Sequence, residues 1–189
     1  MNPFTRPIQW LFIASTLLFL SACSTPISKD YNPQVDFKRY QSLGFLPPES
    51  RTNPEIEQFQ IQQPLVAQRV KQAISRHFLN RGIGIDREPI NGYISAHLQT
   101  ETYLAQDPFS VQFGFGSYGR HGGILFGTRE PLIEEKRYLL VIDIYNPNQE
   151  VVWRGKAPFD PELQQSPQAS EQQVQEVVER ILSEFPPKP

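Results

Sequence analysis

Cys23 is the only thiol in the chain, and its surroundings are the most informative of any reactive side chain. It follows Leu20-Ser21-Ala22, at the end of a short apolar segment that starts at Trp10. An apolar run that ends in small residues before a cleavage site is typical of a secretory signal peptide. The pattern predicts that residues 1–22 are removed and that the thiol accepts an acyl chain.

The sequence Leu20-Ser21-Ala22-Cys23 resembles the lipobox of bacterial lipoproteins, in which the cysteine is acylated before the preceding peptide bond is cut. A membrane-spanning helix is the alternative, but it needs about 20 apolar residues, and Ser15 and Thr16 interrupt this run. Ser24, in place of an aspartate, resembles the signal for transfer to the outer membrane. The resemblance implies a Gram-negative envelope lipoprotein that faces the periplasm and is held in the membrane by palmitate-like acyl chains.

The balance of charges argues against a nucleic-acid-binding role. The chain has 18 Lys and Arg residues against 20 Asp and Glu residues, and its net charge is −2 at pH 7, whereas nucleic-acid binding needs a basic face. Once Cys23 is acylated, no thiol remains for a disulfide, so an apolar core must stabilise the fold. The length suits one compact domain. We expect a signal peptide at 1–22, a tether at 23–34 and a single domain at 35–187.

The histidines give no sign of a metal site. His77, His97 and His121 are far apart in the sequence, and no two have the short spacing of a metal-binding pair such as H-x-x-x-H. We expect His77 beside the apolar stripe of a helix, His97 on the polar face of a strand and His121 in a glycine-rich segment. No residue cluster indicates a metal or another cofactor.

A segment rich in glycine and aromatic residues runs from residue 107 to residue 128 and is the part least explained by packing. Its stretch 114–119 has the G-x-G-x-x-G spacing of a phosphate loop, but the strand and helix that such a loop requires are not predicted around it. A long loop or an irregular hairpin is predicted instead. Phe113, Phe115 and Tyr118 form a candidate contact loop for a partner, and a plain mobile loop is the alternative.

Asp143 is the most unusual carboxylate, because it stands in an otherwise apolar strand. We expect it either to face solvent or to form an ion pair with Arg154 or Lys136, since an unpaired buried carboxylate is costly. No serine has the sequence surroundings of a catalytic nucleophile. The sequence therefore favours a non-enzymatic protein.

The first third of the domain is predicted to contain one strand and one helix. The strand is expected at Phe37–Phe45, where Pro47-Pro48 stops it. Residues 51–63 are polar and interrupted by proline, so they are predicted as a surface loop in which Glu55 is solvated. The helix is expected at Pro64–Gly82, because apolar residues recur there at three- and four-residue spacing before a glycine cap.

The rest of the domain is predicted to supply the centre of a sheet and a second helix. Residues 94–98 alternate between apolar and polar, which indicates a strand with one buried face. Residues 138–145 are apolar on both faces, so we expect a central strand that pairs with 150–155 through a tight turn. Ser170-Glu171-Gln172-Gln173 fits a capping box and starts the helix, whose apolar stripe ends at Phe185.

This order of elements predicts an α+β fold, a two-layer sandwich of a mostly antiparallel sheet with two helices packed on one face. The chain also resembles the lipoproteins of the family Domain of Unknown Function 4136 over nearly all of its length after the signal peptide. The matching segments are the lipobox at 20–23, Asp30–Pro33, Asp36–Tyr40, Val152–Gly155 and Ile181–Pro187. The resemblance implies a lipid-anchored domain that faces the periplasm, and it brings no catalytic or binding residues.

Three functions are compatible with these observations, and the third, an envelope hydrolase, has no catalytic arrangement in the sequence to support it. The first is a non-enzymatic interaction module for envelope assembly or maintenance, whose partner is an envelope protein or the cell wall. The second is a small-molecule or glycan-binding module that uses the glycine- and aromatic-rich segment 113–127. An exposed apolar patch or a free sheet edge would favour the first, and a concave aromatic pocket with converging polar groups would favour the second.

Overall fold

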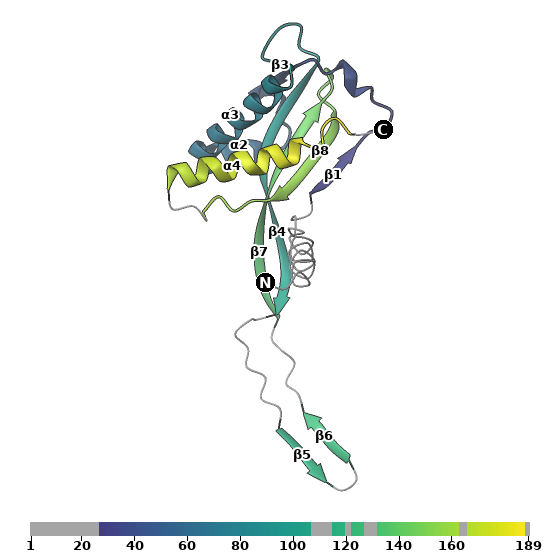
Figure 1. The fold of residues 1–189 in the computed structure, drawn as a ribbon, viewed down its shortest axis with the longest axis vertical. Helices are drawn as coiled ribbons and strands as arrows, with labels where there is room; N and C mark the ends of the chain where they lie inside the picture. The colour runs from purple at the N-terminus through teal and green to yellow at the C-terminus, as the bar shows by residue number, and fades with distance from the viewer. Residues whose placement is uncertain (1–26, 107–114, 120–121, 127–131, 163–165, 188–189) are drawn as a thin grey trace, which may run out of the picture.

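The computed structural model describes residues 27–106, 115–119, 122–126, 132–162 and 166–187. Its main sheet has six strands in the order β1-β8-β7-β4-β2-β3, and Figure 1 labels all of them but β2. The strands are β1 (Ser28–Tyr31), β2 (Ser42–Phe45), β3 (Gly84–Ile85), β4 (Gly92–Gln106), β7 (Leu132–Tyr145) and β8 (Val151–Pro158). β1, β8, β7 and β4 are antiparallel neighbours, whereas β2 runs parallel to β4 and to β3. The sheet is therefore mixed and mostly antiparallel.

Two long helices, α3 (Pro64–Asn80) and α4 (Pro167–Leu182), lie side by side on one face of the sheet (Figure 1). A shorter helix, α2 (Pro54–Gln62), packs against β4 and α3. Two 3₁₀ helices, η1 (Phe37–Arg39) and η2 (Pro48–Ser50), flank β2 in the sequence. This architecture is the predicted α+β two-layer sandwich, with α2 as an additional helix.

A second, two-stranded sheet lies within the glycine-rich segment. Its strands are β5 (Phe115–Gly119) and β6 (Gly122–Phe126), and they pair in antiparallel register with Phe115 opposite Phe126. Of the two predictions for this segment, the hairpin is therefore the one that the structure supports.

β7 forms the centre of the core, as its continuous apolar run predicts. Leu140, Ile142 and Ile144 are fully buried in the cluster that also contains the apolar residues of α3 and α4. The opposite face of β7 is buried as well, because Val141 is 1% exposed and Asp143 is 0% exposed. Burial of both faces fits its internal position between β4 and β8.

α3 confirms the helix that the spacing predicts. Val66, Val70, Ile74 and Phe78 follow one face of the helix and are buried. Gly82, just beyond the helix, has a φ of 77°, the left-handed conformation that glycine adopts without steric cost.

The apolar stripe of α4 is buried as predicted, but the capping box predicted at Ser170 is wrong. The cap is Ser166, whose hydroxyl accepts a hydrogen bond from the amide of Ala169 at 3.2 Å, and Pro167 occupies the first helical position. Ser170 lies inside the helix, where its hydroxyl accepts a hydrogen bond from Arg69 of α3 at 3.1 Å. A serine followed by proline is thus the earlier start signal, and it sets the beginning of the helix.

The N-terminal part of the domain differs from the prediction at two points. Residues Ser28–Tyr31, within the predicted tether 23–34, form the edge strand β1 and pair with β8. The predicted strand Phe37–Phe45 is wrong in its first half, because Asp36 accepts a hydrogen bond from the amide of Lys38 at 3.1 Å and caps η1. This local hydrogen bond competes with the extended conformation, so the strand begins only at Ser42.

The surface loop predicted at 51–63 is also wrong, because most of it forms α2. Asn53 caps this helix by accepting a hydrogen bond from the amide of Glu55 at 2.9 Å, and Pro54 is the first helical residue. Ile56 and Phe59 are only 2% and 4% exposed. Two buried side chains three residues apart thus attach a short, mostly polar helix to the core of the domain.

Candidate functional site

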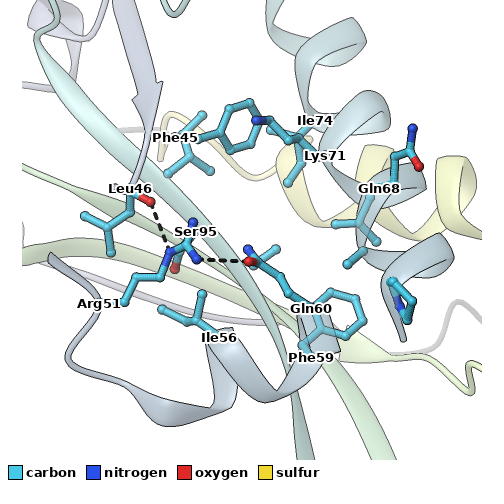
Figure 2. Close-up of a pocket in the computed structure, with 15 residues that line it drawn as sticks. Phe45, Leu46, Arg51, Ile56, Phe59, Gln60, Gln68, Lys71, Ile74 and Ser95 are labelled. Atoms are coloured by element: carbon cyan, nitrogen blue, oxygen red, sulfur yellow. Dashed lines mark hydrogen bonds between the residues drawn. The ribbon is translucent and has the colours of Figure 1, made fainter. Parts of the chain in front are cut away.

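A pocket of about 320 Å³ opens between α2, α3 and the neighbouring parts of β2 and β4 (Figure 2). We call it the α2–α3 pocket. Its wall includes Phe59, Val70, Ile74 and Ile94, which are buried residues of the main core. Pockets of about 300 Å³ or more with apolar walls are typical of small-ligand sites. The pocket therefore has the size and lining to receive a small apolar group.

Two cationic side chains line the pocket next to the end of β2. Arg51 donates from Nε to the carbonyl of Leu46 at 3.2 Å and from Nη1 to Oε1 of Gln60 at 2.9 Å, as Figure 2 shows. Lys71 places its Nζ 4.4 Å from the centre of the Phe45 ring. Within the ion pairs formed by the described residues, neither cation has a carboxylate partner. The pocket thus carries two cations that form no ion pair with the described carboxylates.

The edge of β4 is open to the pocket beyond Ile94. β2 pairs with β4 only as far as Phe45 and Ile94, and the amide of Leu46 then donates to the carbonyl of Ile94 at 2.8 Å. Because the backbone groups of a strand alternate in direction, the N–H and C=O of Ala96 point to the same side. Ala96 is half-buried and lines the pocket, and no described strand pairs with it there.

A polar network adjoins the pocket at Ser95. The hydroxyl of Ser95 lies 3.0 Å from that of Tyr145, and Tyr145 donates to Oδ2 of Asp143 at 3.5 Å. Arg154 binds both carboxylate oxygens of Asp143, at 2.6 and 2.9 Å. Burial raises the pKa of Tyr145, so its hydroxyl keeps its proton and remains a donor. The structural ion pair expected for Asp143 is therefore confirmed, with Arg154 as the partner.

His97 connects this network to α2. Its Nε2 lies 3.3 Å from Oε2 of Glu55 and 3.3 Å from Nδ2 of Asn53, and its Nδ1 lies 3.9 Å from Asp143. Nδ1 is buried and has no hydrogen-bond partner among the described residues. Burial lowers the pKa of His97 and outweighs the opposite effects of Asp143 and Glu55. The neutral ring is therefore the favoured form in the folded protein at neutral pH.

The network lacks the geometry of a serine hydrolase. A serine nucleophile needs a base within about 2.6–3.2 Å of its hydroxyl. Ser95 instead pairs with Tyr145, and His97 directs Nε2 toward Glu55. Asp143 is occupied by Arg154, so its charge is already compensated. This arrangement suits structural support of the pocket wall better than proton transfer.

The residues that the sequence singles out are only partly described. Cys23, Phe113 and His121 lie outside the described residues. Phe115 and Tyr118 belong to β5, but their side chains also lie outside the description. The acylation site and the contact loop therefore stay predictions.

Sequence reasoning missed the α2–α3 pocket, because it assigned residues 51–63 to a loop. The signals that could have revealed α2 are Asn53-Pro54, which is a favourable helix start, and the three-residue spacing of Ile56 and Phe59. Even with α2 predicted, nothing in the sequence indicates that Arg51 and Lys71 reach the same pocket. That juxtaposition depends on how α2 and α3 pack.

Neither a metal site nor a membrane-spanning helix is found among the described residues. In this part of the chain, no group of three or more His, Cys, Asp or Glu side chains is placed to hold a metal ion. The helices of the described residues are all too short or too polar to span a membrane.

Comparison with known proteins places the chain in an uncharacterised family. A family model described as "Domain of unknown function (DUF4136)" matches residues 27–187. No curated protein matches the chain. Among solved structures, it is similar to a PDZ domain protein from Parabacteroides distasonis, with 15% sequence identity and a TM-score of 0.46. The match covers 94% of this chain and 40% of that protein, so the chain spans less than half of its length.

Proposed function

The chain belongs to the family of the Domain of unknown function (DUF4136), and we propose that it is a lipid-anchored binding module of a Gram-negative cell envelope. Cys23 carries the acyl chains, and Ser24 directs the protein to the outer membrane, where the domain faces the periplasm. The order of residues 20–23 supports this anchor. The module is non-enzymatic and serves envelope assembly or maintenance through the partner that it binds.

The α2–α3 pocket is the observation that carries the binding role. It combines apolar walls, two cations that pair with no carboxylate of the described residues, and a half-buried strand edge at Ala96. Converging polar groups in an apolar hollow are typical of a ligand site. The polar network behind Ser95 holds that wall of the pocket in place. Ligand binding is therefore assigned to this pocket rather than to the segment 113–127.

The anchor is tested by labelling intact cells with radioactive palmitate. The full chain should incorporate label and fractionate with the outer membrane, whereas Cys23→Ala should incorporate none, because the acyl acceptor is missing. Cys23→Ala should also retain residues 1–22 or be misplaced. Equal labelling of both proteins would exclude lipid attachment at this residue.

The pocket is tested with 1-anilinonaphthalene-8-sulfonate, an apolar anion that fluoresces when it leaves water. The folded protein should bind this dye at one saturable site. Ala67→Trp should abolish binding, because Ala67 lines the pocket and a large ring would fill it. The matched control is Leu79→Trp, at an exposed position of α3 that should bind the dye normally. Absence of saturable binding to the parent protein would refute the binding role of this pocket.

A further inference from the structure

We propose that the α2–α3 pocket binds the C-terminal end of an extended peptide. In this complex the peptide adds to the open edge of β4 at Ala96 and brings its terminal carboxylate to Arg51 and Lys71. The inference rests on the binding function proposed above, and it names the chemical class of the partner.

The strand edge is the first reason to choose a peptide. By the alternation of the strand, the N–H and C=O of Ala96 face the same side of β4 as those of Ile94, and no described strand pairs with them there. An acyl chain or a flat apolar molecule would cover these two groups without offering a hydrogen bond, which is costly for buried backbone. A peptide backbone offers one acceptor and one donor at the spacing of a strand, so it satisfies both groups.

The apolar wall is the second reason. Side chains of an added strand alternate between its two faces, so one side chain next to the terminus points toward α3. There it meets Val70 and Ile74, which are core residues, and Phe59 of α2. A volume of about 320 Å³ suits one or two terminal residues rather than a long segment. The preferred peptide therefore ends in an apolar residue.

The position of the cations sets the direction of the peptide. β2 runs parallel to β4 and ends at Phe45, level with Ile94. An incoming strand that is antiparallel to β4 would therefore run toward Leu46 and stop there, because β2 already occupies the edge beyond. Its last atoms are the terminal carboxylate, and they arrive where Arg51 contacts Leu46 and Lys71 covers Phe45 (Figure 2). The side chain of an internal Asp or Glu fits less well, because the peptide backbone would then have to continue past this point, and Leu46 already occupies that space.

α2 limits how far the peptide can extend along β4. Its first turn is held to the strand by Asn53 and Glu55, both 3.3 Å from Nε2 of His97. Ile56, one turn along the same helix, is buried against Leu46 and Tyr145. The edge of β4 is thus open only next to Ala96, so the terminal residue alone pairs with the strand and the preceding residues leave the edge where α2 contacts His97.

The test uses pools of N-acetylated pentapeptides that are mixed at the first four positions and end in Val, Leu or Phe. One set has free terminal carboxylates, and the matched set has terminal amides. The free-acid pools should displace the dye bound in the pocket of the parent protein, and the amidated pools should be about tenfold weaker or more, because the charge-assisted hydrogen bonds are lost. In ¹⁵N-labelled protein, the free acids should also shift the amide signal of Ala96.

Lys71→Gln and Arg51→Gln should each reduce displacement by the free acids about tenfold and leave the amidated pools nearly unchanged. Lys136→Gln, which removes a cation on β7 far along the sheet, is the matched control and should bind as the parent does. If the dye binds but no free-acid pool displaces it, the peptide proposal is wrong and the pocket remains a ligand site. If neither the dye nor any pool binds, and the Ala96 signal does not move, both proposals fail.

Discussion

Asp143 and Arg154 illustrate how a costly residue is accommodated in the core. A fully buried carboxylate without a partner would destabilise the fold by several kcal/mol. Arg154 stands directly opposite Asp143 in the β7–β8 hairpin and binds it with two hydrogen bonds. The Arg154 side chain remains 45% exposed, so its guanidinium neutralises Asp143 while it keeps part of its own hydration. The hairpin register is therefore what makes an aspartate tolerable in the centre of the sheet.

His97 and His77 should make the stability of the fold depend on pH. The pKa of His97 is lowered from 6.5 mainly by burial, and the pKa of His77 is lowered by burial and then by Arg81. The unfolded chain therefore binds more protons than the folded chain once the pH falls through about 6.5. We expect the free energy of unfolding to be highest above about pH 7, and to fall as the pH drops through 6.5 toward the folded pKa values. Urea denaturation between pH 7.5 and pH 5.5 measures this.

The controls are single substitutions that remove one titrating ring each. His97→Gln and His77→Gln should each flatten part of the pH dependence, and the double variant should be nearly flat in this window, because most carboxylates titrate at lower pH. An increase in stability on acidification of the parent protein would contradict the expected direction of both pKa shifts.

At the scale of elements, the parts that the sequence predicts well are long and strongly periodic. α3, α4 and β7 each carry four or more apolar residues at regular spacing, and their buried faces follow that spacing. α2 buries only Ile56 and Phe59, and its third apolar residue, Ile61, is exposed, so its pattern is too short to distinguish it from a polar loop. η1 depends on one hydrogen bond to Asp36, and the spacing of apolar residues gives no sign of that bond. Short elements held by caps and by tertiary contacts are where prediction fails.

Gly155 lies at a point where α4 approaches the sheet closely. A Cβ at this position of β8 would lie against the ring of Trp153 and 2.7 Å from Cγ2 of Ile181 on α4. Gly155→Ala should therefore destabilise the domain by about 1–3 kcal/mol, because either the ring or the helix must shift. Gly44→Ala on β2 is the matched control, since its nearest neighbour is the end of the Ile90 side chain at 3.1 Å.

Urea denaturation of the two glycine variants measures the difference in the free energy of unfolding. The control should lose clearly less stability, because the end of an isoleucine can move more easily than a packed indole. Equal stability of Gly155→Ala and the parent would mean that α4 does not press on β8 in solution.

The polar network and the pocket bring together residues that are far apart in the sequence. The pairing of Asp143 with Arg154 was foreseeable, because a short turn fixes which residues of a hairpin stand opposite each other. Tyr145 lies on β7 with Asp143, but the contact of Asp143 with His97 and that of Tyr145 with Ser95 require β4, which lies more than 30 residues away in the sequence. Arg51, between η2 and α2, and Lys71, in α3, likewise come from separate parts of the chain. A single sequence does not specify such distant neighbours, so the candidate site could not be predicted from it.

An aromatic cluster joins the two ends of the described domain. Phe185, just after α4, is 1% exposed and makes edge-to-face contacts with four rings. Phe37 and Tyr40 come from the N-terminal part, Phe78 from α3 and Trp153 from β8. Arg81 adds a hydrogen bond to the carbonyl of Phe185 at 2.7 Å. The end of the domain is thus part of its core, and the sheet, the helices and both ends should unfold as one cooperative unit.

Phe185→Ala tests this unity. Removing a buried ring that touches four others should lower the free energy of unfolding by about 3–5 kcal/mol, through lost burial and the cavity that is left. The matched control is Leu79→Ala, an exposed apolar residue of α3 that should change stability by no more than about 0.5 kcal/mol. Tryptophan fluorescence and circular dichroism, followed in the same urea titration, should give coincident transitions for both variants. If Phe185→Ala were as stable as Leu79→Ala, or if its two signals separated, the C-terminal segment would be an appendage and not a member of the core.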